Sequence, residues 1–152
     1  MIMTIVSPRR RQLGSSLLEG LIAIAIFSVG VLGLVGMQAR MLQHSGDSKY
    51  RADAADLANQ IIGQMWADRA NLAAYSHYGT GGAGTCSPGG APSANATVTS
   101  WTAAVQNALP GAPANNQQIS VGPNNAVTVT VCWKGPADTA SHNYVASAQI
   151  NG

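Results

Sequence analysis

The sequence predicts an α+β fold in which a long N-terminal helix packs on a small antiparallel β-sheet and a disulfide ties down a loop. Three observations predict this arrangement. An uncharged apolar run near the N-terminus continues into an amphipathic stretch, the last third of the chain alternates between apolar and polar residues, and the 152 residues include two cysteines. Helical and strand periodicity therefore occupy separate parts of the chain.

The first predicted element is a helix of membrane-spanning length. Residues 20–39 carry no charge, and at 1.5 Å per residue they span about 30 Å. Arg9, Arg10 and Arg11 precede this run and would stay on the cytoplasmic side. An ionised side chain in hydrocarbon costs roughly 3 kcal/mol, so Glu19 at the edge of the run indicates an interfacial position or a specific cationic partner.

Residues 14–19, Gly-Ser-Ser-Leu-Leu-Glu, resemble the cleavage region of type IV prepilins and type II secretion pseudopilins. In these families a dedicated peptidase cuts after the glycine, and glutamate is the fifth mature residue. Residues 21–38 are similar to the PilV type of minor pilin. The resemblance implies cleavage between Gly14 and Ser15, N-methylation of Ser15 and subunit assembly through Glu19. The fold that it implies is type IV pilin-like.

Two other interpretations of this segment explain less of the pattern. A conventional signal peptide would have a shorter apolar core followed by a small-x-small cleavage site, which the end of the run lacks. A simple uncleaved anchor accounts for the length and the arginines but leaves Gly14 and Glu19 together unexplained. The pilin-type interpretation is therefore preferred.

The predicted helix continues beyond the membrane segment to about Tyr75, because no proline occurs between Pro8 and Pro88. Residues 53–66 are amphipathic, and an apolar stripe along them should pack on the sheet. Its members are Leu57, Ile61, Met65, Ile62 and Trp66. We therefore expect a leader peptide at 1–14, a membrane or filament-core half of the helix at 15–43, an amphipathic half at 44–75 and a globular head at 76–152.

Residues 77–118 are rich in Gly, Ala, Ser, Thr, Pro and Asn, a composition typical of irregular loop. One short helix is predicted within this loop. Ser100 can cap it, Trp101 and Val105 recur at helical spacing, and Pro110 with the glycine after it ends it. Trp101 should anchor the loop to the core.

The C-terminal third predicts a three-stranded antiparallel meander. Strands are expected at 118–121, 126–134 and 143–150, separated by turns rich in Gly, Pro and Asn. The middle strand has the clearest alternation, and its apolar members should face the helix. They are Val127, Val129, Val131 and Trp133.

Cys86 and Cys132 are the two cysteines. An even count in an exported chain favours a disulfide, which would stabilise the fold by about 4 kcal/mol in the chain-entropy model. A metal pair or a catalytic thiol is the alternative, but no further ligand cluster or Cys/His spacing supports either one.

The sequence offers little enzymatic chemistry. His44, His77 and His142 are isolated from one another, and neither a nucleophile motif nor a phosphate-binding loop is present. We therefore expect no enzyme activity, metal, cofactor or small-molecule substrate. Removing the leader changes the net charge from +2 to −1, because all three of its charges are arginines. Nothing basic remains to favour nucleic acid.

The resemblance implies a minor pilin that takes part in assembling or priming a type IV pilus. Its partners would be the prepilin peptidase, other minor and major pilins contacted through the N-terminal helix, and the pilus assembly platform. The precursor would cross the inner membrane once, with a cytoplasmic N-terminus and a periplasmic head, and later reach the pilus at the cell surface. The alternatives are a type II secretion minor pseudopilin and a membrane-anchored adhesive module that binds through residues 77–118.

Overall fold

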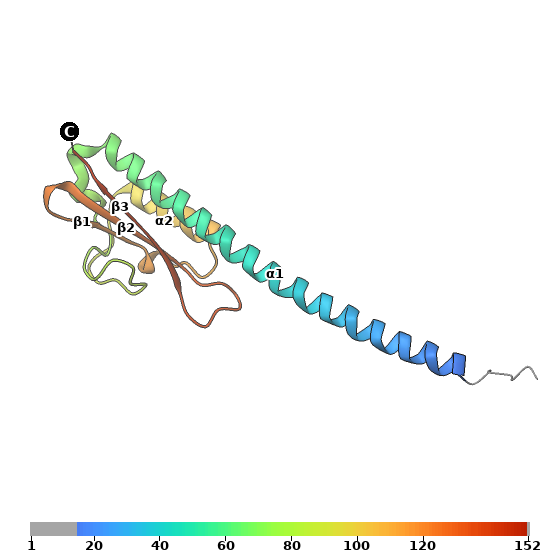
Figure 1. Ribbon diagram of the computed structural model, residues 1–152. Coiled ribbons are helices and arrows are strands. Elements are labelled where there is room, and N and C mark those ends of the chain that lie inside the picture. Colours follow the sequence, from blue (N-terminus) through green and yellow to red (C-terminus); the bar gives the residue numbers. More distant parts are fainter. Residues whose placement is uncertain (1–14, 152) are drawn as a thin grey trace, which may run out of the picture. The chain divides into compact units, whose positions relative to one another are not determined.

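The computed structural model describes residues 15–151, which form two units that divide between His44 and Ser45 (Figure 1). Each unit is described by itself. The helices are α1 (Ser15–Ala67) and α2 (Ala96–Ala108), with 3-10 segments at Arg69–Tyr75, Ala114–Asn116 and Pro123–Asn125. The strands are β1 (Gln118–Val121), β2 (Ala126–Trp133) and β3 (His142–Gln149).

Helix α1 ends at Ala67, earlier than the predicted limit near Tyr75. Asp68 leaves the helical conformation, with φ −112° and ψ 41°. Its carboxylate accepts a hydrogen bond of 2.7 Å from the Asn71 side chain, and its carbonyl accepts one from the Asn71 N–H. An aspartate that bonds to nearby backbone and side chains competes with helical hydrogen bonds. The chain therefore continues as the 3-10 segment Arg69–Tyr75.

The three strands form one antiparallel sheet in the order β1-β2-β3. Gln118 pairs with Thr130 in the first ladder, and Ala126 pairs with Gln149 in the second. Both ladders run one residue against one without a bulge. The predicted strands are confirmed to within one residue at each end.

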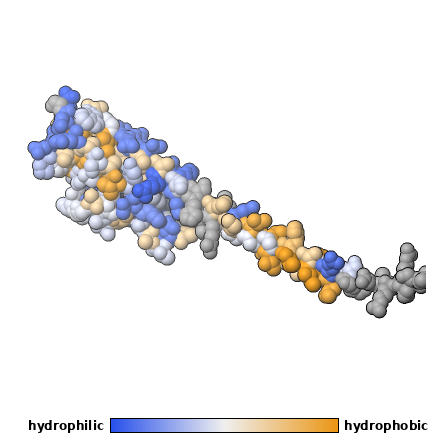
Figure 2. Space-filling model, viewed as in Figure 1, coloured by the Kyte–Doolittle hydropathy of each residue, from blue (hydrophilic) through white to orange (hydrophobic). Residues whose placement is uncertain are grey.

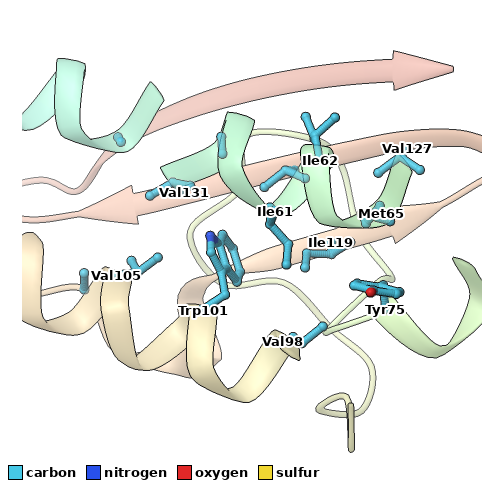
Figure 3. Close-up of a cluster of buried hydrophobic side chains, with 14 of the residues drawn as sticks. Ile61, Ile62, Met65, Tyr75, Val98, Trp101, Val105, Ile119, Val127 and Val131 are labelled. Carbon is cyan, nitrogen blue, oxygen red and sulfur yellow. The ribbon is translucent and has the colours of Figure 1, made fainter. Parts of the chain in front are cut away.

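One face of the sheet packs against α1 and α2 (Figure 3). Helix α1 contributes a fully buried stripe of Ala54, Ala58, Ile61 and Met65, and β2 contributes the four predicted apolar residues. Trp66 was predicted to belong to this stripe, and this is wrong because it is 43% exposed. Two alanines on α1 allow the sheet to approach closely, and Leu57 is only partly buried.

Helix α2 begins about one turn before the predicted start. Asn95 is its N-cap, and the Asn95 Oδ1 accepts a hydrogen bond of 2.8 Å from the Thr97 N–H, so Ser100 lies within the helix. Trp101 is buried, and its indole N–H donates to the Leu57 carbonyl oxygen at 2.9 Å. The predicted anchoring role of Trp101 is confirmed.

The second face of the sheet is covered in part, which alternation in β2 did not predict. Thr130 and Cys132 are buried on this face. The Gly84 N–H donates to the Thr130 hydroxyl at 3.2 Å, and the Gly84 carbonyl accepts from the Asn143 amide at 2.9 Å. The disulfide between Cys86 and Cys132 closes the same segment. The predicted α+β, type IV pilin-like fold with its disulfide-tied loop is confirmed.

Candidate assembly segment and disulfide-tied loop

The N-terminal part of α1 is apolar on every side. Residues Ser16–Gln38 form a 23-residue apolar segment, which by length and composition can cross a membrane. Leu21, Ile24 and Ile26 point in different directions around the helix, and all three are more than 60% exposed. Figure 2 shows the apolar surface of this segment in orange. A helix without a polar face is suited to lipid or to a helix bundle.

Glu19 lies in the second turn of α1 and is exposed. No hydrogen bond or ion pair within residues 15–151 engages its carboxylate. Ser15 begins α1, whereas Gly14 lies outside the described residues, so the geometry of the predicted cleavage site is not described. Glu19 is therefore a carboxylate at the end of an apolar surface without a partner in the described chain.

The glycines of the apolar segment leave the helix backbone accessible. A Cβ atom added at Gly30, Gly33 or Gly36 would meet nothing within 4 Å. The Ser28 hydroxyl donates to the Ile24 carbonyl oxygen at 2.7 Å, so its hydrogen-bonding need is met within the helix. The described chain gives these small residues no packing role, and they leave room for another helix to approach closely.

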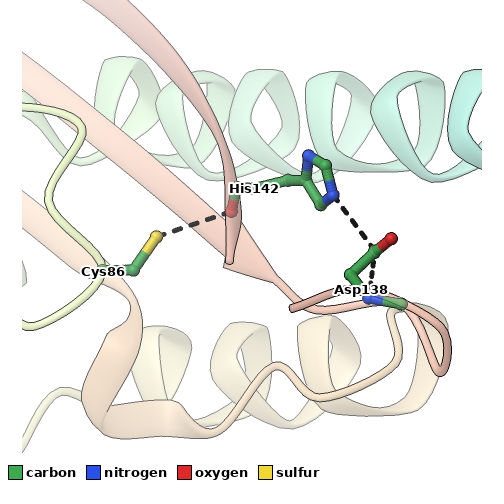
Figure 4. A network of polar contacts seen from close by, with 4 residues as sticks. Cys86, Asp138 and His142 are labelled. Atoms are coloured by element: carbon green, nitrogen blue, oxygen red, sulfur yellow. Dashed lines mark hydrogen bonds and ion pairs between the residues drawn. The ribbon is translucent and has the colours of Figure 1, made fainter. Parts of the chain in front are cut away.

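The disulfide joins the loop to Cys132 near the end of β2, and Figure 4 shows the surroundings of Cys86. The Cys86 sulfur lies 3.4 Å from the His142 carbonyl oxygen, and it carries no proton to donate because it is oxidised. His142 Nε2 lies 3.0 Å from the Asp138 carboxylate, which also accepts a 2.8 Å hydrogen bond from the Gly135 N–H. The carboxylate thus closes the turn between β2 and β3.

His77 has a structural role that sequence reasoning missed. Its side chain is buried, the Ser93 N–H donates to His77 Nδ1 at 3.0 Å, and Nε2 lies 3.0 Å from the Ala114 carbonyl oxygen. Since Nδ1 accepts and the carbonyl can only accept, the proton is on Nε2. His77 therefore joins two stretches of the loop that lie far apart in the sequence.

The structure does not bring the titratable residues of the head together as a chemical site. Among the described residues, no three His, Cys, Asp or Glu side chains are grouped as metal ligands. Both cysteines are used in the disulfide. The geometry therefore points to the apolar segment with Glu19 as the candidate functional site.

Comparison with known proteins identifies the same segment. Residues 9–35 match the family model described as the prokaryotic N-terminal methylation motif. No curated protein and no solved structure matches the chain. The motif supports a protein of the type IV pilin or pseudopilin kind, made as a membrane-anchored precursor.

Proposed function

We propose that this chain is a minor pilin that the prepilin peptidase cleaves between Gly14 and Ser15. It takes part in assembling or priming a type IV pilus, and it enters the pilus with other minor pilins. Its role is structural, without catalysis. One observation carries the proposal: the methylation motif coincides with a helix that is apolar on all sides, and that same helix continues into the core of a folded head.

Cleavage changes the electrostatics of the anchor. The precursor has Arg9, Arg10 and Arg11 at the cytoplasmic surface, and these charges oppose movement of the helix out of the membrane. Removing them leaves a single ammonium group on Ser15. The processed helix can then leave the lipid for a bundle of similar helices.

Glu19 would pair with the terminal ammonium of a neighbouring subunit. An unpaired charge is costly in an apolar bundle, and a partner of opposite sign offsets that cost. The carboxylate is exposed and unpartnered in the described chain, as this role requires. The exposed glycines at 30, 33 and 36 would let neighbouring helices pack closely.

The N-terminus and mass of the protein, measured in envelope and sheared-pilus fractions, test the proposal. The expected result is a chain that begins at Ser15, with or without one added methyl group. Recovery of the chain with residues 1–14 attached, from cells whose peptidase is active, would refute it. A deletion strain tests the choice of system, because loss of twitching supports the pilus and loss of enzyme secretion supports a type II secretion pseudopilin.

A further inference from the structure

The two outer edges of the sheet differ in the state of their backbone groups. At the β1 edge, Ile119 exchanges both backbone hydrogen bonds with His77, at 2.9 and 3.0 Å. The His77 ring is itself fixed between Ser93 and Ala114. The middle of the β1 edge is therefore closed by the chain's own loop.

At the other edge, the register of the sheet shows which groups of β3 point outward. Successive residues of a strand direct their backbone groups to opposite sides. Ile119 bonds outward to His77, so its two neighbours in β1 bond to Thr128 and Thr130 of β2. The even-numbered residues of β2 therefore face β1, and its odd-numbered residues bond to even-numbered residues of β3. The outer edge of β3 therefore consists of the N–H and C=O groups of Asn143, Val145, Ser147 and Gln149.

This outer edge is open. All four residues are exposed, and no backbone hydrogen bond within residues 15–151 reaches their N–H or C=O groups. Edge strands are usually protected from pairing by lysine, proline or a bulge. Residues 143–149 contain no charged residue and no proline, and the β2–β3 ladder has no bulge. Val145 adds an exposed apolar side chain at the middle of the edge.

We propose that the outer edge of β3 accepts an extended strand from a different pilin-type chain and so adds a fourth strand to the sheet. Backbone hydrogen bonds supply the affinity in this mode of binding, and side chains on alternate positions supply the specificity. Because the edge is uncharged, the incoming strand is uncharged and rich in β-branched or small polar residues. The nature of the partner rests on the proposed function, whereas the open edge belongs to the head alone.

A second copy of this chain does not fit the edge. If β3 paired antiparallel with β3 of a second copy, a two-fold axis normal to the sheet would relate the two heads. The amphipathic halves of their α1 helices would then point in opposite directions. Subunits of one filament are related by a repeated screw operation, which contains no such two-fold axis and keeps their heads in a shared direction. Subunits that share a direction would place β1 of one beside β3 of the next, but β1 of this chain is closed by His77. The donor is therefore a pilin-type head whose own first strand is uncovered.

Amide hydrogen exchange of the full processed chain tests this proposal. The chain is measured free in detergent and in the complex recovered from its bacterium's envelope through an affinity tag after Gly152. We expect the amides of Asn143, Val145, Ser147 and Gln149 to exchange at least about tenfold more slowly in the complex. Equal exchange in the two samples, recovery of the chain alone, or a complex that contains only copies of this chain would overturn it.

Substitution of Ser147 provides a matched pair of variants. Ser147→Pro removes an outward N–H while leaving the bonds to β2, and Ser147→Ala removes only the hydroxyl that lies 3.2 Å from the Thr128 hydroxyl. The proline variant should lose the protection of the edge and the alanine variant should keep it. The same result for both would overturn the proposal. If Ser147→Pro fails to fold, Val145→Lys against Val145→Thr makes the same comparison.

These outcomes separate the edge from the proposed function. A chain that retains residues 1–14 but shows a protected edge refutes the processing and supports strand addition. A chain that begins at Ser15 but has an unprotected edge supports the processing and refutes strand addition.

Discussion

At the scale of single residues, a buried glutamine extends the sheet just before β1 begins. Gln117 is fully buried, and its Oε1 accepts a 2.9 Å hydrogen bond from the Cys132 N–H. Its Nε2 donates to the carbonyl oxygens of Cys132 and Pro113, at 3.0 and 3.1 Å. One side chain thus takes the place of a strand partner beside the disulfide.

Gln117→Leu should lower the free energy of unfolding by about 3 kcal/mol, because it leaves the buried N–H and C=O groups of Cys132 without partners. The measurement is urea unfolding of the detergent-solubilised full chain, followed by tryptophan fluorescence. Gln106→Leu on the exposed side of α2 is the control and should change stability by less than about 0.5 kcal/mol. Equal effects of the two variants would contradict the role of Gln117.

Tyr75 makes the stability of the head sensitive to alkaline pH. Burial raises the pKa of the Tyr75 hydroxyl above its usual 10.0, as do the charge of Asp68 and the 3.2 Å hydrogen bond donated to it. A group whose pKa is higher in the folded state contributes stability below the unfolded pKa and loses it as the pH rises through the folded pKa. The contribution of Tyr75 is therefore present below about pH 10 and lost above it.

Tyr75→Phe should reduce the fall in Tm between pH 9 and pH 11, since phenylalanine cannot ionise. The measurement is thermal unfolding of both chains at a series of pH values in that range. Tyr78→Phe serves as the control, because the Tyr78 hydroxyl makes no hydrogen bond in the described structure. If Tm falls as much between pH 9 and pH 11 in the Tyr75→Phe chain as in the unaltered protein, ionisation of Tyr75 is not the cause.

Glu19→Ala should leave export and peptidase cleavage intact while reducing surface pili and recovery of the chain with other pilins. In the proposed assembly, the carboxylate is needed only when the ammonium group of a neighbouring subunit enters the apolar bundle. N-terminal sequencing, pilus counts and co-purification measure the three steps, with Ser16→Ala as the exposed neighbouring control. Normal piliation of the Glu19→Ala strain would remove this residue from assembly.

At the scale of elements, the start of α2 depends on one cap. Asn95→Ala should lower the free energy of unfolding by about 1 kcal/mol, because the Thr97 N–H loses its acceptor. Ser100→Ala, at the position that the sequence had suggested as the cap, should change it by only a few tenths of that amount. Denaturant unfolding of the two variants measures both, and a larger loss for Ser100→Ala would reverse the assignment.

The strands could be predicted closely from sequence, whereas the ends of the helices could not. Alternation within β2 and turn residues on either side of it fix a strand on local grounds. The end of α1 depends on the hydrogen bond that the Asp68 carboxylate accepts from the Asn71 side chain. The start of α2 depends on which of several polar side chains accepts a hydrogen bond from a backbone N–H of the first helical turn, and this is Asn95. Neither of these hydrogen bonds can be predicted from hydrophobic periodicity.

At the scale of the whole molecule, some of the functional and structural residues could be predicted from the sequence and others could not. Glu19 could be proposed from the resemblance of residues 14–19 to prepilins, and the cysteine pair could be predicted from its count in an exported chain. His77 and Gln117 could not, because their partners are backbone groups brought close only by folding. The buried second face of β2 was missed for the same reason, since a loop distant in the sequence covers it.

The disulfide should stabilise the head more than any single contact that the loop makes. It joins Cys86 and Cys132, which are 46 positions apart in the sequence, and restricting the unfolded chain over that length corresponds to about 4 kcal/mol in the chain-entropy model. Replacing both cysteines by serine should therefore lower the free energy of unfolding by about that amount. The proposed cleavage after Gly14 should be unaffected, because its site lies in the N-terminal segment and not in the head.

Urea unfolding of the full chain in detergent measures this loss, with wild-type protein held in reductant as the matched control. The reduced protein and the double serine variant should unfold at similar urea concentrations, both well below the oxidised protein. Hydrogen exchange should rise in residues 84–86, since the Gly84 bonds to Thr130 and Asn143 depend on the loop staying on the sheet. A double serine variant as stable as the oxidised chain would mean that these polar contacts alone hold the loop.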